Sequence, residues 1–294
     1  MGPSGPAERP SGRETRTTSA EGSTMRRIAR VALLAVVCSL GVPEGKIPPF
    51  ALKAPAIRSG PPRFAFNGRD LSGFSTYTRY HGSKDPQGVF SVEDGMIRVT
   101  GREFGGLTTR DSFDNYHLVV EWKWGLRTWT PRRHRARNSG VMVHCVGAEG
   151  DAFASWMASI ECQIIEGGTG DFIVVPGKGN VPSLTSDVRV ADGQSYYQKG
   201  GEPKTKPGGR FNWWGRDPAW RDVAWFRGPL DVDKPVGEWN RVDLVCRGDS
   251  ITYLLNGVVM NVGTGAKWSA GRILLQSEGA EIFFRKFEVR PLVE

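Results

Sequence analysis

Alternating apolar and polar residues in the segment Ser159–Glu166 predict a β-strand with one buried face. The apolar side chains at alternate positions from Ile160 share that face, whereas Glu161 and Gln163 lie on the other. Glu166 breaks the alternation, because an unbroken strand would direct its carboxylate into the core, where an unpaired charge is costly. A β-bulge or the end of the strand would turn Glu166 back beside Glu161 and Gln163. The pattern therefore predicts a polar surface with two carboxyl groups and an amide.

Two upstream segments show the same kind of alternation and add ionisable residues to the predicted polar surface. Tyr116–Trp124 places Glu121 and Lys123 opposite an apolar face, and Asn138–Val146 places His144 opposite another. We expect the three strands to present these residues on a common surface. The alternative is an ordinary antiparallel sheet with one solvated side, which gives the same alternation.

Turn signals between short apolar runs indicate that most of the chain forms β-structure. Phe90–Val99 is predicted to be a hairpin turning at Asp94 and Gly95, and Ile251–Met260 a second hairpin turning at an Asn-Gly pair. Further strands are predicted at Ile273–Gln276 and Ile282–Val289, and no long segment has helical periodicity. Residues 62–294 are therefore predicted to form one all-β domain, a two-sheet antiparallel β-sandwich or jelly roll.

Residues 192–236 depart from this pattern, because they are rich in Gly and Pro and predict a long loop with four tryptophans, at 213, 214, 220 and 225. A loop of this length in a compact domain is usually functional or disordered, and its aromatic content argues against disorder. The indole rings could stack on sugars, or they could pack only against one another. The arginine-rich residues 132–137 are expected to form a solvated loop.

The N-terminal residues lack the patterning of a folded domain. Residues 1–24 are expected to be a disordered extension, with Met25 as an alternative start. Residues 25–42 begin with arginines and continue with a short apolar run, which predicts a secretory signal peptide and a secreted or periplasmic protein. That run is too short for a comfortable membrane span, so none is expected after cleavage. Lipid attachment at Cys38 is not expected, because Val37 suits it poorly, and residues 43–61 are expected to be a linker.

Charge and cysteine content narrow the function classes. The net charge is +8, but nine basic and four acidic residues precede residue 61, which leaves +3 on the remaining chain. With no basic helix or recognised binding motif, nucleic acid is not an expected partner. Cys145, Cys162 and Cys246 lie within apolar strand patterns and are expected to be buried, inward-facing free thiols, although a Cys145–Cys162 disulfide stays open in an exported protein. No Cys and His spacing matches a zinc site.

A series of short motifs carries a family resemblance. The motifs are Phe66–Gly73, Val92–Gly95, Glu121–Lys123, Asn138–Gly140, Glu161–Ile164, Gly237–Asn240, Leu255–Gly257, Leu275–Gln276 and Phe284–Phe287. In this order the series resembles the 3-keto-disaccharide hydrolase domain family, also described as 3-keto-glucoside lyases and 3-keto-2-hydroxyglucal hydratases, over residues 64–292. The resemblance implies a concanavalin A-like, laminin-G-like jelly roll, export from bacterial cells, and action on oxidised glucosides. The chain has His144 and Glu166 where members of the family often carry Arg and Asp.

The implied reaction needs a base, an acid and a group that stabilises an enolate. A ketone at carbon 3 acidifies the proton on carbon 2, so that a base can remove it and expel the group on carbon 1, after which water adds. Glu161 and Glu166 are the candidates for base and acid in either order, and Lys123 or His144 for the enolate. His144 could instead be the base, or could hold a divalent metal together with carboxylates. The candidates for substrate binding are Glu121, Gln163, Asn138, Trp213, Trp214 and Gln276.

Two other functions fit the same residues. Glu161-x-Gln163-x-x-Glu166 resembles the E-x-D-x-x-E strand of laminarinase-type retaining glycosidases, whose two outer acids lie about 5–5.5 Å apart. In this chain Gln163 replaces the middle Asp, and ordinary glycoside hydrolysis would act on an unoxidised β-glucan. The other alternative is a non-catalytic, lectin-like carbohydrate-binding module, because a sandwich fold does not by itself imply catalysis.

Overall fold

The structure, a computed structural model, describes residues 46–293. The predicted N-terminal extension (1–24), the signal peptide (25–42) and Cys38 lie outside the described residues. Within residues 46–293, the chain forms two antiparallel eight-stranded sheets and one smaller three-stranded sheet. The structure therefore confirms the predicted all-β, two-sheet sandwich of the jelly-roll, concanavalin A-like type.

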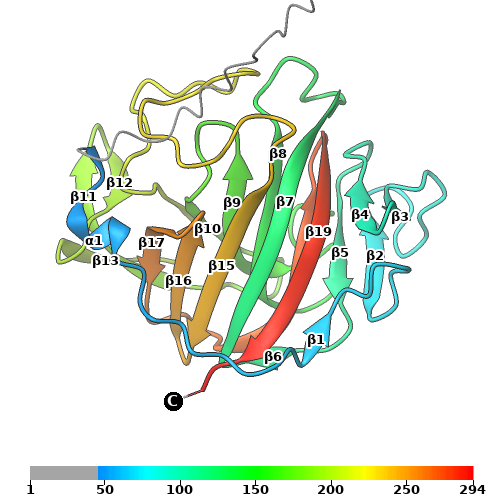
Figure 1. The fold of residues 1–294 in the computed structure, drawn as a ribbon, viewed down its shortest axis with the longest axis horizontal. Coiled ribbons are helices and arrows are strands. Elements are labelled where there is room, and N and C mark those ends of the chain that lie inside the picture. The colour runs from blue at the N-terminus through cyan, green and yellow to red at the C-terminus, as the bar shows by residue number, and fades with distance from the viewer. Residues whose placement is uncertain (1–45, 294) are drawn as a thin grey trace, which may run out of the picture. The chain divides into compact units, whose positions relative to one another are not determined.

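The first sheet is built around two long central strands, β7 (Tyr116–Thr128) and β19 (Ala280–Pro291), which pair along most of their length. Together with β15 they run side by side across the centre of Figure 1. The strand order is β17 (Val258–Gly263), β16 (Ser250–Leu255), β15 (Asn240–Arg247), β7, β19, β4 (Met96–Val99) and β3 (Phe90–Glu93), with β1 (Phe64–Ala65) on β19.

The second sheet contains the two strands that carry most of the predicted polar residues, β8 and β9. Its order is β14 (Gly209–Phe211), β10 (Phe172–Val175), β9 (Ala158–Ile165), β8 (Asn138–Val146), β18 (Ala270–Ser277), β5 (Gly105–Thr109) and β2 (Phe74–Thr78), with β6 (Phe113–Asp114) on β18.

Both predicted tight turns are present, and their backbone angles explain the residues that form them. Asp94 and Gly95 join β3 to β4, and Asn256 and Gly257 join β16 to β17. All four residues have positive φ, between 49° and 84°. Asn, Asp and Gly tolerate this left-handed region better than other residues, and turns with two such positions match the twist of a hairpin.

The main hydrophobic core lies between the inner faces of the two large sheets. Trp122 and Trp124 of β7 and Ile160 and Cys162 of β9 belong to the same core cluster. Because side chains alternate along a strand, the neighbours of these residues point away from the core. Glu161 therefore lies on the outer face of the second sheet, whereas Lys123 lies on the outer face of the first.

The predicted loop at 192–236 is partly β-structure. Its first half contains β12 (Gln194–Tyr197), β13 (Glu202–Lys206) and β14, and β12 and β13 flank β11 (Leu184–Ala191) in the small third sheet. Residues 212–239 then run without a strand up to β15. The Gly and Pro residues within and between these short strands obscure their alternation in the sequence.

The described part of the predicted linker packs against the domain. A single short helix, α1 (Pro49–Leu52), buries Ala51, and the ring of Phe50 lies edge-on to Tyr197 at 5.9 Å. Ser59 pairs with Leu292 beside the end of β19. Among the described residues, no helix is long and apolar enough to cross a membrane.

Candidate active site

A cavity of about 300 Å³, lined by both polar and apolar side chains, opens on the outer face of the second sheet, directly over β9. Glu161 and Gln163 of β9 line it, as their alternation predicted. Asn138 of β8 and Gln276 of β18 extend the polar surface to the neighbouring strands. The structure therefore brings four of the ten predicted site residues into one cavity. The other lining residues are Arg132, Phe153, Trp156, Ile165, Ile173, Val175, Arg210, Trp220, Asp222 and Glu278.

Glu161 is a buried carboxyl group with little compensation from its surroundings. Its side chain is about 5% exposed, and Oε1 has no hydrogen-bond partner among the described residues. Burial, reinforced by the negative charge of Glu278, raises the pKa of Glu161 to about 8. Glu161 is therefore mostly protonated at neutral pH, in a state from which it can donate a proton.

Gly140 has no side chain, and the Glu161 carboxyl group occupies the space beside it. Gly140 lies opposite Gln163 in the pairing of β8 with β9, next to the Glu161 carboxyl group. A Cβ atom at position 140 would lie 2.5 Å from Oε1 of Glu161, closer than atoms in contact can approach. The Asn-Ser-Gly motif at 138–140 thus has a steric function at the cavity.

Of the three side-chain amides near Glu161, those of Gln163 and Asn138 are hydrogen-bonded to each other, whereas that of Gln276 has no partner among the described residues. Nε2 of Gln163 donates to Oδ1 of Asn138 at 2.5 Å and to the carbonyl oxygen of Ser139 at 2.9 Å. The Gln276 amide lies close enough to Glu161 to oppose the rise of its pKa, but neither of its side-chain polar atoms has a partner in hydrogen-bonding geometry among the described residues, although Gln276 is only 1% exposed. Buried polar groups normally have partners. The unpartnered Gln276 and Glu161 Oε1 therefore indicate a place for a hydrogen-bonding ligand.

A second acid and two arginines complete the cavity, and the sequence analysis did not identify them. Nη2 of Arg132 contacts Glu278 at 2.9 Å, and Nη1 contacts Asp222 at 2.8 Å. Arg210 pairs with the buried Asp171. Burial raises the pKa of Glu278, and Arg132 opposes this shift by favouring the charged carboxylate.

A sequence signal for Glu278 existed, whereas one for Arg132 did not. Glu278 follows Gln276 by two positions, which places both side chains on the same face if the strand continues. Residues 132–137 were expected to form a solvated loop, and this expectation is wrong for Arg132 and Arg137. Arg132 is held by two carboxylates from distant parts of the chain, and local charge patterning contains no information about such partners.

Glu166 lies past the end of β9, as one reading of the sequence required, but it does not line the cavity with Glu161. Its Oε1 accepts from Nη1 of Arg137 at 2.6 Å, and Oε2 accepts from the backbone N–H of the same residue at 2.9 Å. Both side chains are almost fully buried. The indole of Trp225 covers the Arg137 guanidinium at 4.1 Å. Glu166 thus forms a buried ion pair rather than the second acid of a shared site.

His144 is turned away from the cavity by a β-bulge. The pairing of β8 with β9 shifts between Val143 and Val146, and His144 has a φ of +52°. The shift reverses the predicted sides: the His144 ring lies edge-on to the buried Tyr116 at 6.1 Å, and Cys145 joins a second apolar cluster with Met142. Burial lowers the pKa of His144 to about 4, and a weak backbone interaction opposes this only partly. His144 lies apart from Glu161 and Glu278.

Glu121 and Lys123 do not share a surface with Glu161, contrary to the sequence expectation. Both project from β7, which belongs to the other sheet. Oε2 of Glu121 accepts from Nε of Arg285 at 2.6 Å, on the outer face of the first sheet. Alternation correctly identified the outward side of β7 and β9, but it cannot show to which sheet a strand belongs.

Trp213 and Trp214 are core residues instead of sugar-stacking platforms. They are 1% and 7% exposed, and their rings meet edge to face at 5.0 Å. The tryptophan of this region that lines the cavity is Trp220, whose Nε1 donates to the backbone carbonyl of Glu166 at 2.8 Å. The sequence left open whether these rings stack on sugars or pack against one another. Trp213 and Trp214 pack in the core, whereas Trp220 borders the site.

The alternative in which His144 and carboxylates together hold a metal is not formed, because the bulge separates this imidazole from them. Within residues 46–293, no three or more His, Cys, Asp or Glu side chains are grouped as metal ligands. Cys145, Cys162 and Cys246 are buried free thiols, as predicted. Cys162 faces the main core and Cys145 the second cluster, so the disulfide alternative does not apply to this structure.

Comparison with known proteins shows the family of the chain. Residues 62–290 match the model of the 3-keto-alpha-glucoside-1,2-lyase-like domain, which is most of the sequence. The chain belongs to this family, and the resemblance read from its motifs is confirmed. No curated protein sequence matches the chain.

Solved structures with a similar arrangement of strands include enzymes and binding modules. A protein from Parabacteroides distasonis ATCC 8503, provisionally described as a glycosyl hydrolase, has 18% identity and a TM-score of 0.44, over 78% of this chain and 92% of that one. The β-glucanase of Bacillus licheniformis has 10% identity and a TM-score of 0.40, over 80% and 100%. The carbohydrate-binding module CBM66 of Bacillus subtilis has 10% identity and a TM-score of 0.41, over 74% and 95%.

Proposed function

We propose that this protein cleaves 3-keto-glucosides by elimination followed by hydration, with Glu161 and Glu278 as the proton-transferring pair. The observation that carries the proposal is the pairing of two unlike acids in one cavity. Burial raises the pKa of both carboxyl groups, but Glu278 is in contact with the Arg132 guanidinium, which favours its charged form, whereas Glu161 is buried without a positive partner in contact. Environments that separate the protonation states of two carboxyl groups define an acid and a base.

In the first step, the charged Glu278 removes the proton from carbon 2. The electrons of the C–H bond form an enolate with the carbon 3 ketone, and Arg132 or Arg210 stabilises the negative charge that develops on its oxygen. The enolate then collapses and the bond from carbon 1 to the glycosidic oxygen breaks. That oxygen takes the proton of Glu161, so the aglycone leaves as a neutral alcohol.

In the second step, water adds to the double bond between carbons 1 and 2. Glu161, now ionised, takes a proton from the water as its oxygen bonds to carbon 1, and Glu278 returns its proton to carbon 2. Both acids regain their starting states, and the net reaction is hydrolysis. The free amide of Gln276 is placed to bind substrate hydroxyls during both steps.

Two features separate this proposal from the alternatives. A retaining glycosidase would need Glu166 free and facing Glu161, but Arg137 occupies both oxygens of Glu166. A lectin-like module does not require a carboxyl group whose pKa lies near neutrality, and such a shift is typical of catalytic acids. We further propose export from the cell, on the basis of the basic start and apolar run of residues 25–42.

A cleavage assay with a chromogenic 3-keto-glucoside and its unoxidised parent tests the function. The purified protein should cleave only the oxidised substrate, and Glu161→Gln and Glu278→Gln should each lower kcat by about 10²–10⁴-fold. Glu202→Gln, at an exposed position of β13, is the matched control and should keep full activity. Each reaction is run with and without chelator to test for a metal requirement.

The other outcomes are equally specific. Cleavage of the unoxidised parent would indicate a retaining glycosidase instead. Binding of the oxidised sugar without any turnover, unaffected by the two glutamine variants, would indicate a binding module. Full activity in Glu278→Gln alone would refute the assignment of this residue as the base.

A further inference from the structure

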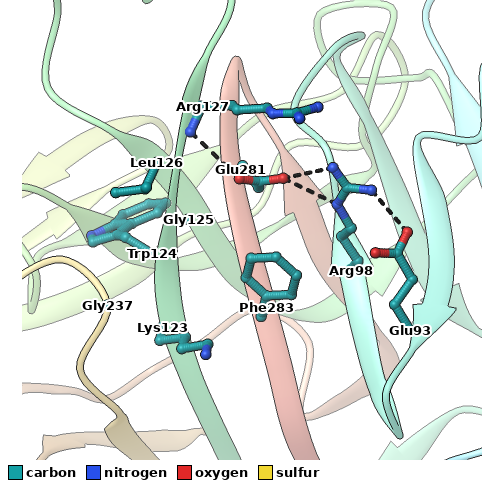
Figure 2. A pocket seen from close by; sticks show the side chains of 10 residues that line it. All are labelled: Glu93, Arg98, Lys123, Trp124, Gly125, Leu126, Arg127, Gly237, Glu281 and Phe283. Atoms are coloured by element: carbon teal, nitrogen blue, oxygen red, sulfur yellow. Dashed lines mark hydrogen bonds and ion pairs between the residues drawn. The ribbon is translucent and has the colours of Figure 1, made fainter. Parts of the chain in front are cut away.

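A second cavity, of about 640 Å³, lies on the outer face of the first sheet, away from the proposed active site (Figure 2). Lys123 and Arg127 border it from β7, Glu281 and Phe283 from β19, and Arg98 from β4. The residues come from three adjacent strands whose opposite faces pack in the main core. The cavity therefore rests on a rigid part of the sandwich.

The carboxylates of the cavity are held by one arginine. Arg98 contacts Glu93 at 2.8 Å and Glu281 at 2.7 Å, and Figure 2 shows its guanidinium between the two acids. Gly125 makes room for Glu281, because a Cβ atom at this position would lie 2.3 Å from Oε2 of Glu281. Glu281 is thus fixed across β7, with its oxygens facing the cavity wall rather than Lys123.

Lys123 is a cation without an anionic partner among the described residues. Its Nζ lies 4.9 Å from the ring centre of Trp239 and 5.6 Å from that of Phe283, within the range of cation–π contacts. These rings hold the ammonium group in place but do not neutralise it. Arg127 also forms no ion pair within residues 46–293, and it lies four residues along the same strand, about 13 Å away.

We propose that this cavity is a second saccharide-binding site, selective for anionic saccharides. The half-exposed ring of Phe283 offers an apolar surface for a sugar ring, with Lys123 beside it for a carboxylate or sulfate group. Arg127 would bind a second negative group further along the chain of sugars.

The mixed charge of the cavity favours a saccharide over nucleic acid. Glu281 lies between Lys123 and Arg127 in Figure 2, and Glu93 lies beside it beyond Arg98, so a ligand with a phosphate on every unit is disfavoured. Two aromatic residues line the cavity, Trp124 and Phe283, and Trp124 is buried, so Phe283 is the lining residue that offers a ring to a ligand. Single-stranded nucleic acid, in contrast, is usually bound by several stacking platforms. A polysaccharide with spaced charges meets both conditions. Binding here would hold the protein on a polymer while the cavity over β9 stays accessible.

Affinity electrophoresis of the purified full-length protein tests the site, with hyaluronate, unsulfated chondroitin or neutral dextran in the gel, because the two anionic polymers carry one carboxylate on every second sugar. We expect retardation by one or both anionic polymers and none by dextran. Lys123→Met keeps the apolar stem of the side chain and removes its charge, and it should weaken the apparent affinity by about tenfold. Lys123→Arg should restore most of the binding, and Phe283→Ala should weaken it further.

Two controls make the result specific. Lys204→Met removes the same charge from an exposed position on the small third sheet and should leave retardation unchanged. Glu161→Gln should also leave it unchanged, which separates this site from the proposed function. Equal retardation of the wild type and Lys123→Met, no retardation by either anionic polymer at low salt, or stronger binding to single-stranded DNA than to both polymers would each overturn the proposal.

Discussion

At the scale of single residues, the most consequential feature is the burial of Glu161 without a charge partner in contact. A charged carboxylate at this position would lack the solvation of water, so the folded protein favours the protonated form. The same environment that prepares Glu161 to donate a proton thereby opposes its ionisation. The resulting loss of folding stability can be measured without a substrate.

We predict that Glu161 makes the folded state less stable as the pH rises from about 5 to about 8. Its folded pKa of about 8 lies above the ordinary value of 4.5, so in this interval the unfolded chain releases the proton while the folded protein retains it. Unfolding is then favoured increasingly with pH. The difference in Tm between Glu161→Gln and wild type should therefore become more positive between pH 5 and pH 8.

The exposed Glu202→Gln variant provides the reference for this comparison, because its Tm should run parallel to that of the wild type. Parallel curves for Glu161→Gln as well would show that Glu161 ionises with an ordinary pKa. The acid role proposed for this residue would then lose its physical basis.

At the scale of elements, the site depends on the absence of a side chain in β8. Gly140→Ala should displace the Glu161 carboxyl group, because the added methyl carbon would lie 2.5 Å from Oε1. A small displacement of a catalytic group can cost about 10²-fold in rate. We expect this loss in kcat on the oxidised glucoside, while Gly179→Ala, whose added carbon meets nothing within 4 Å, keeps the wild-type rate.

A second element-scale feature is the ion pair of Arg137 and Glu166, which joins the β7–β8 connection to the end of β9. Arg137→Met should lower the free energy of unfolding by about 3–5 kcal/mol, because it leaves Glu166 buried without a partner. The double variant Arg137→Met/Glu166→Leu should recover much of this loss, since no buried charge remains. Urea denaturation of the single and double variants measures both effects.

Rate measurements on a further variant, Glu166→Gln, distinguish a structural role of this residue from a catalytic one. Glu166→Gln should keep kcat within about tenfold of wild type, because its carboxyl group lies outside the cavity, whereas general acid–base groups contribute about 10²–10⁴-fold. A loss of kcat as large as that of Glu161→Gln, in a variant that remains folded, would return Glu166 to the list of catalytic candidates.

At the scale of the whole molecule, the sequence predicted the strands far better than their arrangement. The hairpins at Asp94 and Asn256 were predictable because their turn residues require particular backbone angles. Alternation correctly placed Glu161 and Gln163 outside the core. It could not place Lys123, because outward residues of both sheets have the same pattern, and it failed at His144, because one extra residue in β8 reverses the sides.

The site residues that the sequence did not predict were missed for one physical reason. Arg132, Arg210 and Glu278 come from three separate connections or strand ends, and they meet only because the sheets align them. Pattern analysis uses neighbours within a few residues, whereas these contacts join positions up to 146 residues apart. The family resemblance supplied the reaction, but the structure was needed to replace Glu166 with Glu278 as the candidate partner of Glu161.

The three described cysteines give a whole-molecule test of the sandwich, because they report on different parts of its interior. Cys162 and Cys246 lie in the main core and Cys145 in the second cluster, and burial raises the pKa of the Cys145 and Cys246 thiols to about 12. Because the thiolate is the reactive form, all three should resist iodoacetamide in the native protein and react after denaturation. Mass spectrometry of the digested peptides would measure this at each position. Rapid modification of Cys145 alone would show that the second cluster opens, whereas modification of all three would contradict the packed sandwich.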